Sequence, residues 1–274
     1  MTVRETPATP SETRFMDRPL FLVSTLAALT AVGSPVFAAD TFAVTLDELA
    51  LANRILAHEN VVDGFGHVSV RDPRDATRYL LARSMAPALV TSADILTYSI
   101  ATDEPIDAQG RVSYLERFIH GGIYRSRPDL NAVVHSHTQS VIPFGVSQVP
   151  LRPIFHMAAF LGGDVPIFEI RATAGDATNL LVSSQILGDA LARTLGAANV
   201  ALMRGHGMVA VAGTLHEAVF RAYYTGRDAE IESEALRLGN PIFLSPGEAK
   251  AATATQAGLV DRSWALWKNA VTQH

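Results

Sequence analysis

Residues 131–138 read Asn131-Ala132-Val133-Val134-His135-Ser136-His137-Thr138. The apolar run before the first histidine predicts a buried strand. Side chains two residues apart on a strand point to the same face, so we expect His135 and His137 to project together. Two imidazoles aimed at one point form half of a typical metal site, although a chance pair of histidines at a strand end would show the same pattern.

Two further stretches supply residues that would complete such a site. Glu116 lies in a helical-looking run at 114–125, and His206 stands between two glycines in the segment 203–208. Three imidazoles and a carboxylate match the needs of a catalytic divalent ion, with one coordination position left for water or substrate. Ser113 and Glu116 also form an S-x-x-E capping box, which would explain this carboxylate as a structural feature of the first helical turn.

These residues carry a resemblance to a known family. The order Glu116-Arg117-Phe118-Ile119-His120, then Arg127-Pro128-Asp129, then Val133-Val134-His135-Ser136-His137 resembles that of the class II aldolase/adducin family. The resemblance covers residues 46–248. Within the family, the chain is similar to the hydroxy-carboxymuconic semialdehyde and dihydroxyphthalate decarboxylases through residues 66–71, Gly-His-Val-Ser-Val-Arg, and 153–160, Pro-Ile-Phe-His-Met-Ala-Ala-Phe.

The resemblance implies a three-layer α/β/α sandwich around a mainly antiparallel central sheet, and a homotetramer with active sites between subunits. Alternating strands and helices alone would suggest a parallel sheet. Hydrophobic periodicity predicts helices at 45–59, 177–195 and 215–238 and strands at 67–71, 79–83, 165–170 and 199–203. Thr45 is expected to cap the first helix.

The resemblance also implies roles for individual residues. His135, His137 and His206 would bind the metal, and Glu116 would be the catalytic carboxylate. In the family's sugar-phosphate aldolases, a tyrosine from the neighbouring subunit donates a proton at the position of His156, and histidine keeps an acid/base group there. His120 follows Glu116 by one helical turn and is expected to pack behind the site instead of binding the metal.

Three departures from the aldolases concern substrate binding. His67 replaces an asparagine that holds phosphate, Arg83-Ser84 replaces a Thr-Gly pair, and Ser113-Tyr114 replaces two serines. Together they favour a planar, non-phosphorylated acid, with His67, Arg83, Ser84 and Tyr114 as substrate-binding residues. Arginine suits bidentate recognition of a carboxylate, although Arg83 could equally form a surface ion pair, and His67 could be satisfied by the backbone.

The leading hypothesis is a metal-dependent carbon–carbon lyase that decarboxylates a hydroxylated aromatic or muconic semialdehyde acid through a metal-stabilised enolate. An aldolase acting on a non-phosphorylated hydroxy-keto acid would share this intermediate. A non-catalytic assembly module like adducin is a third reading, but it would not need a complete set of metal ligands. Three imidazoles suit zinc, while manganese, cobalt and iron stay open.

Composition limits the partners and the domain organisation. A net charge of −5 argues against a nucleic-acid partner, and the absence of cysteine excludes disulfides and thiolate ligands. Residues 1–39 are expected to form a leader, with a disordered start and a secretory signal peptide at 16–38 whose apolar core is too short for a stable membrane span. Residues 40–274 would form one catalytic domain. Export to the periplasm follows from this reading, and a cytoplasmic enzyme is the alternative.

Overall fold

The computed structural model describes residues 35–273. The expected leader, including the signal peptide at 16–38, therefore lies outside the described residues except for its end. Helix α1 (Pro35–His58) begins with a proline, a residue well suited to the first turn of a helix. The expected start at Thr45 is wrong: the Thr45 hydroxyl donates to the carbonyl of Thr41 at 2.8 Å, inside the helix, instead of capping it.

Seven strands form one mixed sheet in the order β3-β2-β1-β4-β7-β6-β5. Strand β5 pairs parallel with β6, and the other five neighbouring pairs are antiparallel. The expectation of a mainly antiparallel sheet therefore holds everywhere but at this edge. The strands are β1 (His67–Arg71), β2 (Arg78–Ala82), β3 (Ile95–Ser99), β4 (Ala132–Ser136), β5 (Ile167–Phe168), β6 (Val200–Met203) and β7 (Gly207–Ala212).

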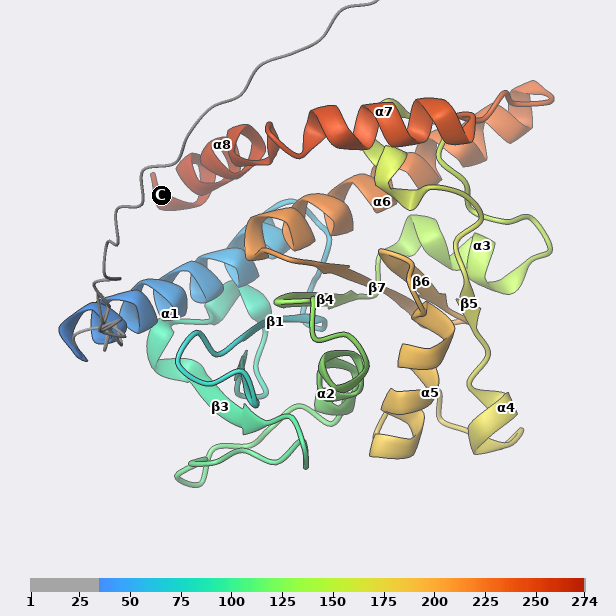
Figure 1. Cartoon of the computed structure of the whole chain (residues 1–274). Helices are drawn as coiled ribbons and strands as arrows, with labels where there is room; N and C mark the ends of the chain where they lie inside the picture. The colour runs from blue at the N-terminus through green and yellow to red at the C-terminus, as the bar shows by residue number, and fades with distance from the viewer. Residues whose placement is uncertain (1–34, 274) are drawn as a thin grey trace, which may run out of the picture. The chain divides into compact units, whose positions relative to one another are not determined.

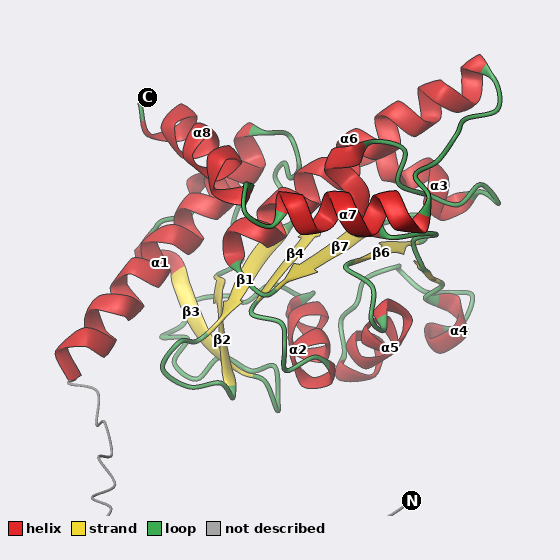
Figure 2. Ribbon diagram, turned by 45° about the horizontal axis from the view of Figure 1, so that its top comes forward, coloured by secondary structure: helices red, strands yellow, loops and turns green. Residues whose placement is uncertain are grey.

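Helices cover both faces of the sheet, which gives the three expected layers (Figures 1 and 2). One face carries α1, α6 (Leu215–Leu238), α7 (Pro246–Gln256) and α8 (Val260–Thr272), and the other carries α2 (Arg117–Ser126), α4 (Arg171–Ala174) and α5 (Gln185–Leu195). The shorter helices are α3 (Ile142–Val146) and the 3-10 turns η1 (Pro87–Leu89), η2 (Ser92–Asp94), η3 (Gln139–Val141) and η4 (His156–Leu161).

Alternate residues of each strand enter separate apolar cores. Val134 of β4 packs in the core that contains α1 and α6, whereas Val133 packs in the core that contains α2 and α5. His135 shares the face of Val133 because strand side chains alternate. Across the β1–β4 pair, His67 lies opposite His135 and Ser69 lies opposite Val133. These polar side chains therefore all project towards α2.

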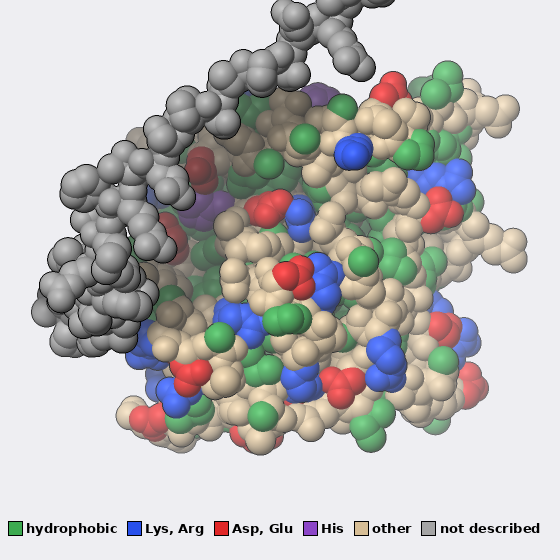
Figure 3. Space-filling view, viewed as in Figure 1, with side chains coloured by type: hydrophobic (Ala, Val, Ile, Leu, Met, Phe, Trp, Pro, Cys, Tyr) green, Lys and Arg blue, Asp and Glu red, His purple; other side chains and the backbone are tan. Residues whose placement is uncertain are grey.

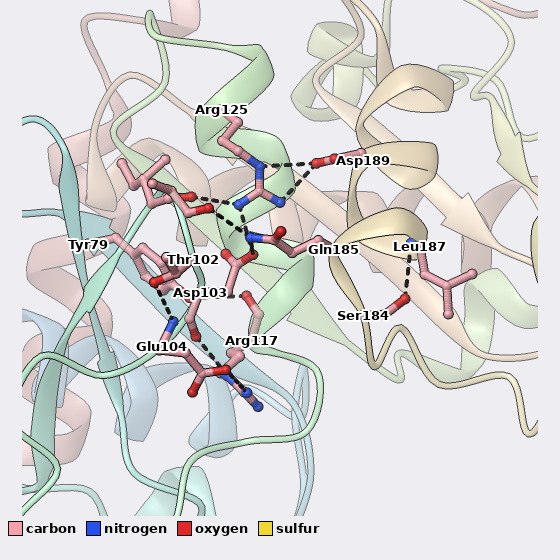
Figure 4. Close-up of polar contacts among 12 residues, drawn as sticks. Tyr79, Thr102, Asp103, Glu104, Arg117, Arg125, Ser184, Gln185, Leu187 and Asp189 are labelled. Atoms are coloured by element: carbon pink, nitrogen blue, oxygen red, sulfur yellow. Dashed lines mark hydrogen bonds and ion pairs between the residues drawn. The ribbon is translucent and has the colours of Figure 1, made fainter.

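Helices α2 and α5 touch through their backbones. A Cβ atom built on Gly122 would lie 2.4 Å from the carbonyl carbon of Gly188, so only glycine permits this approach. Arg125 of α2 fastens the same contact, with its guanidinium 2.8 Å from both the buried Asp103 and Asp189 of α5 (Figure 4). The backbone approach and these ion pairs hold the two helices together.

Two predicted elements are shorter than expected. The strand expected at 165–170 is reduced to β5, and the helix expected at 177–195 begins only at Gln185. Ser184 caps α5 by accepting the Leu187 N–H, and Leu180 has a φ of 67°, which no helix accommodates. Residues 177–184 are instead a loop that reaches the functional site.

The visible surface mixes charges of both signs, with Lys and Arg side chains among Asp and Glu side chains (Figure 3). No helix within residues 35–273 combines the length and apolar character needed to cross a bilayer.

Helix α6 carries two fully buried carboxylates that hold a neighbouring segment. Asp228 Oδ1 accepts the N–H groups of Ile154 and Phe155 at 3.1 and 2.9 Å, and Glu232 Oε2 accepts the Arg152 N–H at 2.9 Å. Burial raises the pKa of both carboxyls to about 7, against the opposing effect of these hydrogen bonds. Folding therefore favours the protonated acids.

The variant Asp228→Asn tests this consequence. Between about pH 4 and 7 the unfolded carboxyl is ionised while the folded one keeps its proton, so this group's contribution to stability is lost as the pH rises through that window. Asparagine keeps an acceptor oxygen and does not titrate. Relative to the variant, the wild type should lose roughly 1–4 kcal/mol of unfolding free energy between pH 4.5 and 8.

Urea unfolding at several pH values, with chelator in every sample, measures this difference. Glu230→Gln, at an exposed position of the same helix, is the matched control and should follow the wild type. Parallel pH profiles for the wild type and Asp228→Asn would contradict the assigned proton uptake.

Candidate metal centre and adjoining pocket

Four side chains from three separate regions converge near the end of the central strand β4. His135 is the penultimate residue of β4, His137 is the first residue after it, His206 lies in the turn between β6 and β7, and Glu116 immediately precedes α2. One ligand atom from each of the four lies within 4.8 Å of all the others. The structure thus brings together the three predicted metal ligands and adds Glu116 to them.

The turn between β6 and β7 is pressed against β4. Gly205 has a φ of 64°, and a Cβ atom on Gly207 would lie 2.0 Å from the Ser136 carbonyl oxygen. A side chain at Gly207 would push this turn away from the strand. Glycine instead lets His206 lie beside His137, with 2.9 Å between the two Nε2 atoms.

Backbone carbonyls orient two of the imidazoles. His135 Nδ1 lies 3.1 Å from the Met208 oxygen and His206 Nδ1 lies 2.9 Å from the Leu180 oxygen. A carbonyl only accepts, so each Nδ1 carries a proton and each Nε2 faces the centre, where it offers a lone pair to a bound cation or, when the ring is protonated, an N–H to Glu116. In the described part of the chain, the buried Nε2 of His135 has no hydrogen-bond partner. A cation would satisfy this otherwise orphaned atom.

Glu116 lies between these imidazoles. Its Oε1 accepts the Val182 N–H at 2.9 Å, and its Oε2 is 3.6 Å from His135 Nε2 and 3.5 Å from His206 Nε2. Burial opposes its ionisation, but the facing imidazoles outweigh burial and hold the pKa of Glu116 well below its usual range. The carboxylate is therefore an anion and a suitable cation ligand.

The capping-box interpretation of Glu116 is wrong. Glu116 is itself the residue that precedes the helix, and its side chain makes no capping hydrogen bond. The Ser113 hydroxyl instead accepts the Tyr98 hydroxyl at 2.9 Å. The helix start leaves Glu116 free to turn towards the histidines.

The donor set fits a divalent metal ion. Burial and the neighbouring imidazoles lower the pKa of His137 to about 4, so this ring is neutral near pH 7 and its nitrogen can bind a cation. Three imidazole nitrogens and one carboxylate oxygen are a common set for zinc and also suit manganese, cobalt or iron.

A cavity of about 400 Å³ opens beside the cluster. Four of the predicted active-site residues line it together with Glu116: His67, Ser84, Tyr114 and His137. The remaining lining residues are Phe65, Gly66, Leu115 and Leu181. The Tyr114 hydroxyl donates to the Met85 carbonyl, and burial raises its pKa to about 12. Tyr114 is therefore suited to packing its ring against a ligand and poorly suited to donating a proton.

Two predicted residues lie outside this cavity's lining. Arg83 forms an ion pair with Asp94, with 2.7 Å between Nε and Oδ1, and its side chain is 38% exposed. His156 begins η4 with an exposed side chain and belongs to neither the cluster nor the lining. A single chain does not contain a subunit interface, so the roles of both residues stay predictions.

His120 packs behind the cavity, as expected from the sequence, but its hydrogen bonds to His67 and Ser69 were not foreseen. His120 is not part of the metal cluster; it contacts His67 at 2.7 Å and Ser69 at 2.6 Å, and Tyr124 lies 2.9 Å beyond Ser69. The spacing contained the signal, since His67 and Ser69 alternate on a strand and His120 and Tyr124 are one helical turn apart.

Comparison with known proteins agrees with this geometry. Residues 47–233 match the Class II Aldolase and Adducin N-terminal domain. The chain belongs to the class II aldolase and adducin family. The family expected from the sequence is therefore confirmed.

Two decarboxylases are similar in sequence. The chain is 35% identical over 235 residues to decarboxylase tropJ of Talaromyces stipitatus, covering 78% of this chain and 88% of that one. It is 31% identical over 195 residues to 3,4-dihydroxyphthalate decarboxylase of Arthrobacter keyseri, covering 66% of this chain and 75% of that one. The fold is similar to that of L-fuculose 1-phosphate aldolase from Glaciozyma antarctica PI12, with a TM-score of 0.71 and 22% identity over 86% and 91% of the chains.

The ligand assignment predicts the outcome of His137→Ala. Loss of one imidazole should lower the bound metal from about one ion per chain to well below half, because the remaining donors hold the cation less completely. Elemental analysis of protein purified without chelator measures this. His58→Ala, at an exposed histidine of α1, is the control and should keep its metal. Full metal content in His137→Ala would remove His137 from the ligand set.

Proposed function

We propose that this protein is a metal-dependent decarboxylase of a hydroxylated aromatic or muconic semialdehyde carboxylic acid. The observation that carries the proposal is a cavity with a cation-binding cluster at one end, apolar walls, and the imidazole of His67 among its polar groups. The sequence similarity to two decarboxylases supports the same class of reaction.

The cavity suits a planar ring better than a sugar phosphate. Phe65, Tyr114, Leu115 and Leu181 supply apolar surface on which a flat ring can pack. Among the described lining residues there is no lysine or arginine to pair with a phosphate dianion, and Arg83, just outside the lining, is paired with Asp94. A hydroxylated acid places less charge in the cavity and fits the available donors.

Each group has a part in the proposed reaction. When bound, a divalent ion would withdraw electron density from the substrate oxygens and so favour loss of carbon dioxide from the adjoining carbon. His67 and Ser84 would hold the leaving carboxylate against the apolar wall. Glu116 has too low a pKa to donate a proton readily, so we assign it to holding the ion.

The proton for the substrate carbon would come from His156 of a neighbouring subunit. This residue is exposed in the single chain and therefore accessible to a second copy. A histidine has a pKa suited to proton transfer near neutrality. The proposed assembly is a homotetramer with each cavity completed at a subunit contact.

Carbon dioxide release tests the reaction class. Metal-loaded protein incubated with 3,4-dihydroxyphthalate and with hydroxy-carboxymuconic acids should release carbon dioxide from at least one acid. Release should stop on chelation and return when a divalent metal is added. Release of an aldehyde from a hydroxy-keto acid, with no carbon dioxide from any acid, would replace the decarboxylase by the aldolase. Activity that persists after complete chelation would refute the metal requirement.

Arg83→Ala tests the predicted grip on the substrate acid. Arg83 precedes the cavity residue Ser84, and the proposed grip requires its guanidinium to leave the pair with Asp94. Loss of a charge-assisted hydrogen bond should raise KM about 10-fold or more with little change in kcat. Arg78→Ala, which breaks a similar exposed pair with Asp75, is the matched control. Equal kinetics for both variants and the wild type would leave Arg83 as a surface ion pair.

A further inference from the structure

A continuous chain of buried hydrogen bonds leads away from the cavity through His67. His67 Nδ1 lies 2.7 Å from His120 Nε2, His120 Nδ1 lies 2.6 Å from Ser69 Oγ, and Ser69 Oγ lies 2.9 Å from the Tyr124 hydroxyl. His67 is 4% exposed, and the other three side chains are buried behind it. Of these four residues, only His67 lines the cavity.

The number of protons on this chain is fixed. Both rings are buried and hydrogen-bonded to uncharged groups, so an imidazolium charge would be costly and each ring is neutral with one N–H. Ser69 and Tyr124 each carry one O–H. Three contacts consume three of these four protons. The fourth is left at one end of the chain, because an arrangement in which Ser69 accepts from both neighbours would leave its own buried O–H without an acceptor among the described residues.

The two ends differ in the partner they offer. If the protons point inward from the cavity, Tyr124 must donate to the Asn131 carbonyl at 3.5 Å, the limit of a useful hydrogen bond. That carbonyl already accepts the Arg71 N–H at 2.8 Å. If the protons point outward, Tyr124 donates to Ser69 at 2.9 Å, and every contact in the chain is short. The outward direction is therefore favoured.

We propose that His120, Ser69 and Tyr124 are positioning residues that hold His67 as the tautomer whose Nε2–H points into the cavity, where it donates to the carboxylate of the substrate. Outward donation passes from Tyr124 to Ser69, from Ser69 to His120, and from His120 to His67 Nδ1. No net proton moves and no group becomes charged. The inference deepens the proposed function, on which the identity of the carboxylate ligand rests.

The tautomer of His67 can be measured without any substrate. In ¹⁵N-histidine-labelled, zinc-loaded protein, the two ring nitrogens of a neutral imidazole have well-separated chemical shifts, and the His67 signals are assigned by their loss in His67→Asn. We expect Nε2 to be protonated in the wild type. A protonated Nδ1 would overturn the proposal, whatever the enzyme catalyses.

Binding of two probes tests the consequence for the ligand. 3,4-Dihydroxybenzoate and catechol share the hydroxyl pair, but only the first has a carboxylate. Ser69→Ala and Tyr124→Phe should weaken calorimetric binding of the acid about 3- to 10-fold, the range of one hydrogen bond, and leave catechol within about 2-fold. Equal loss for both probes would indicate a merely structural role, and no loss for either would show that the chain does not act on the ligand. Both results overturn the proposal.

Matched variants separate tautomer control from packing. Tyr98→Phe also removes a buried hydroxyl 2.9 Å from a serine, but its partner Ser113 has no link to His67, so it should bind both probes normally. His120→Gln should retain affinity for the acid, because its amide N–H₂ can donate to His67 Nδ1. If neither probe binds the wild type, the proposed function loses its support, while the tautomer measurement still decides this inference.

Discussion

The buried contact of Glu116 with two imidazoles and one backbone N–H is the interaction on which the site depends. A carboxylate loses its hydration on burial, and this cost is offset only by groups that favour the anion. His135, His206 and the Val182 N–H supply them from three separate regions. Figure 4 shows Arg125 of α2 paired with Asp189 of α5. Together with the glycine contact between the two helices, this pair keeps Glu116, just before α2, close to the loop before α5. The packing of α2 against α5 therefore also fixes the position of the Glu116 carboxylate.

Because side chains alternate along each strand, the site histidines of β1 and β4 lie on one face of the sheet and the residues of the core under α1 and α6 lie on the other. On β4, Val134 packs in the core under α1 and α6, while Val133 and His135 face α2. The neighbouring strand β1 repeats this arrangement in register, so His67 and Ser69 join the same face. A shift of one residue in this pairing would exchange the two sets of side chains. The apolar residues that stabilise the opposite core thus also fix which way the histidines point.

Local patterns allowed part of this site to be predicted, and the missing part depends on long-range contacts. The His135 and His137 pair follows from strand periodicity, and the family resemblance identified His206 and Glu116. The capping box at Ser113 was misleading because the same four-residue pattern occurs without the cap. Carbonyl partners such as Leu180 carry no sequence signal, since every residue has that group. The N-terminal part of α1 was missed because Thr45 presented a plausible cap further along the chain.

The proposed reaction uses neighbouring imidazoles in opposite tautomers. In each ring, the hydrogen-bond partner of Nδ1 decides which nitrogen carries the proton. His135 and His206 face carbonyl oxygens, which accept, so their Nε2 lone pairs point at the cation position. His67, whose ring centroid is 5.0 Å from that of His135, faces a second imidazole that can donate. On our proposal its Nε2–H therefore points at the substrate. On the same proposal, one residue type would serve a cation and, a few ångströms away, an anion, and the buried hydrogen bonds behind the rings would make the difference.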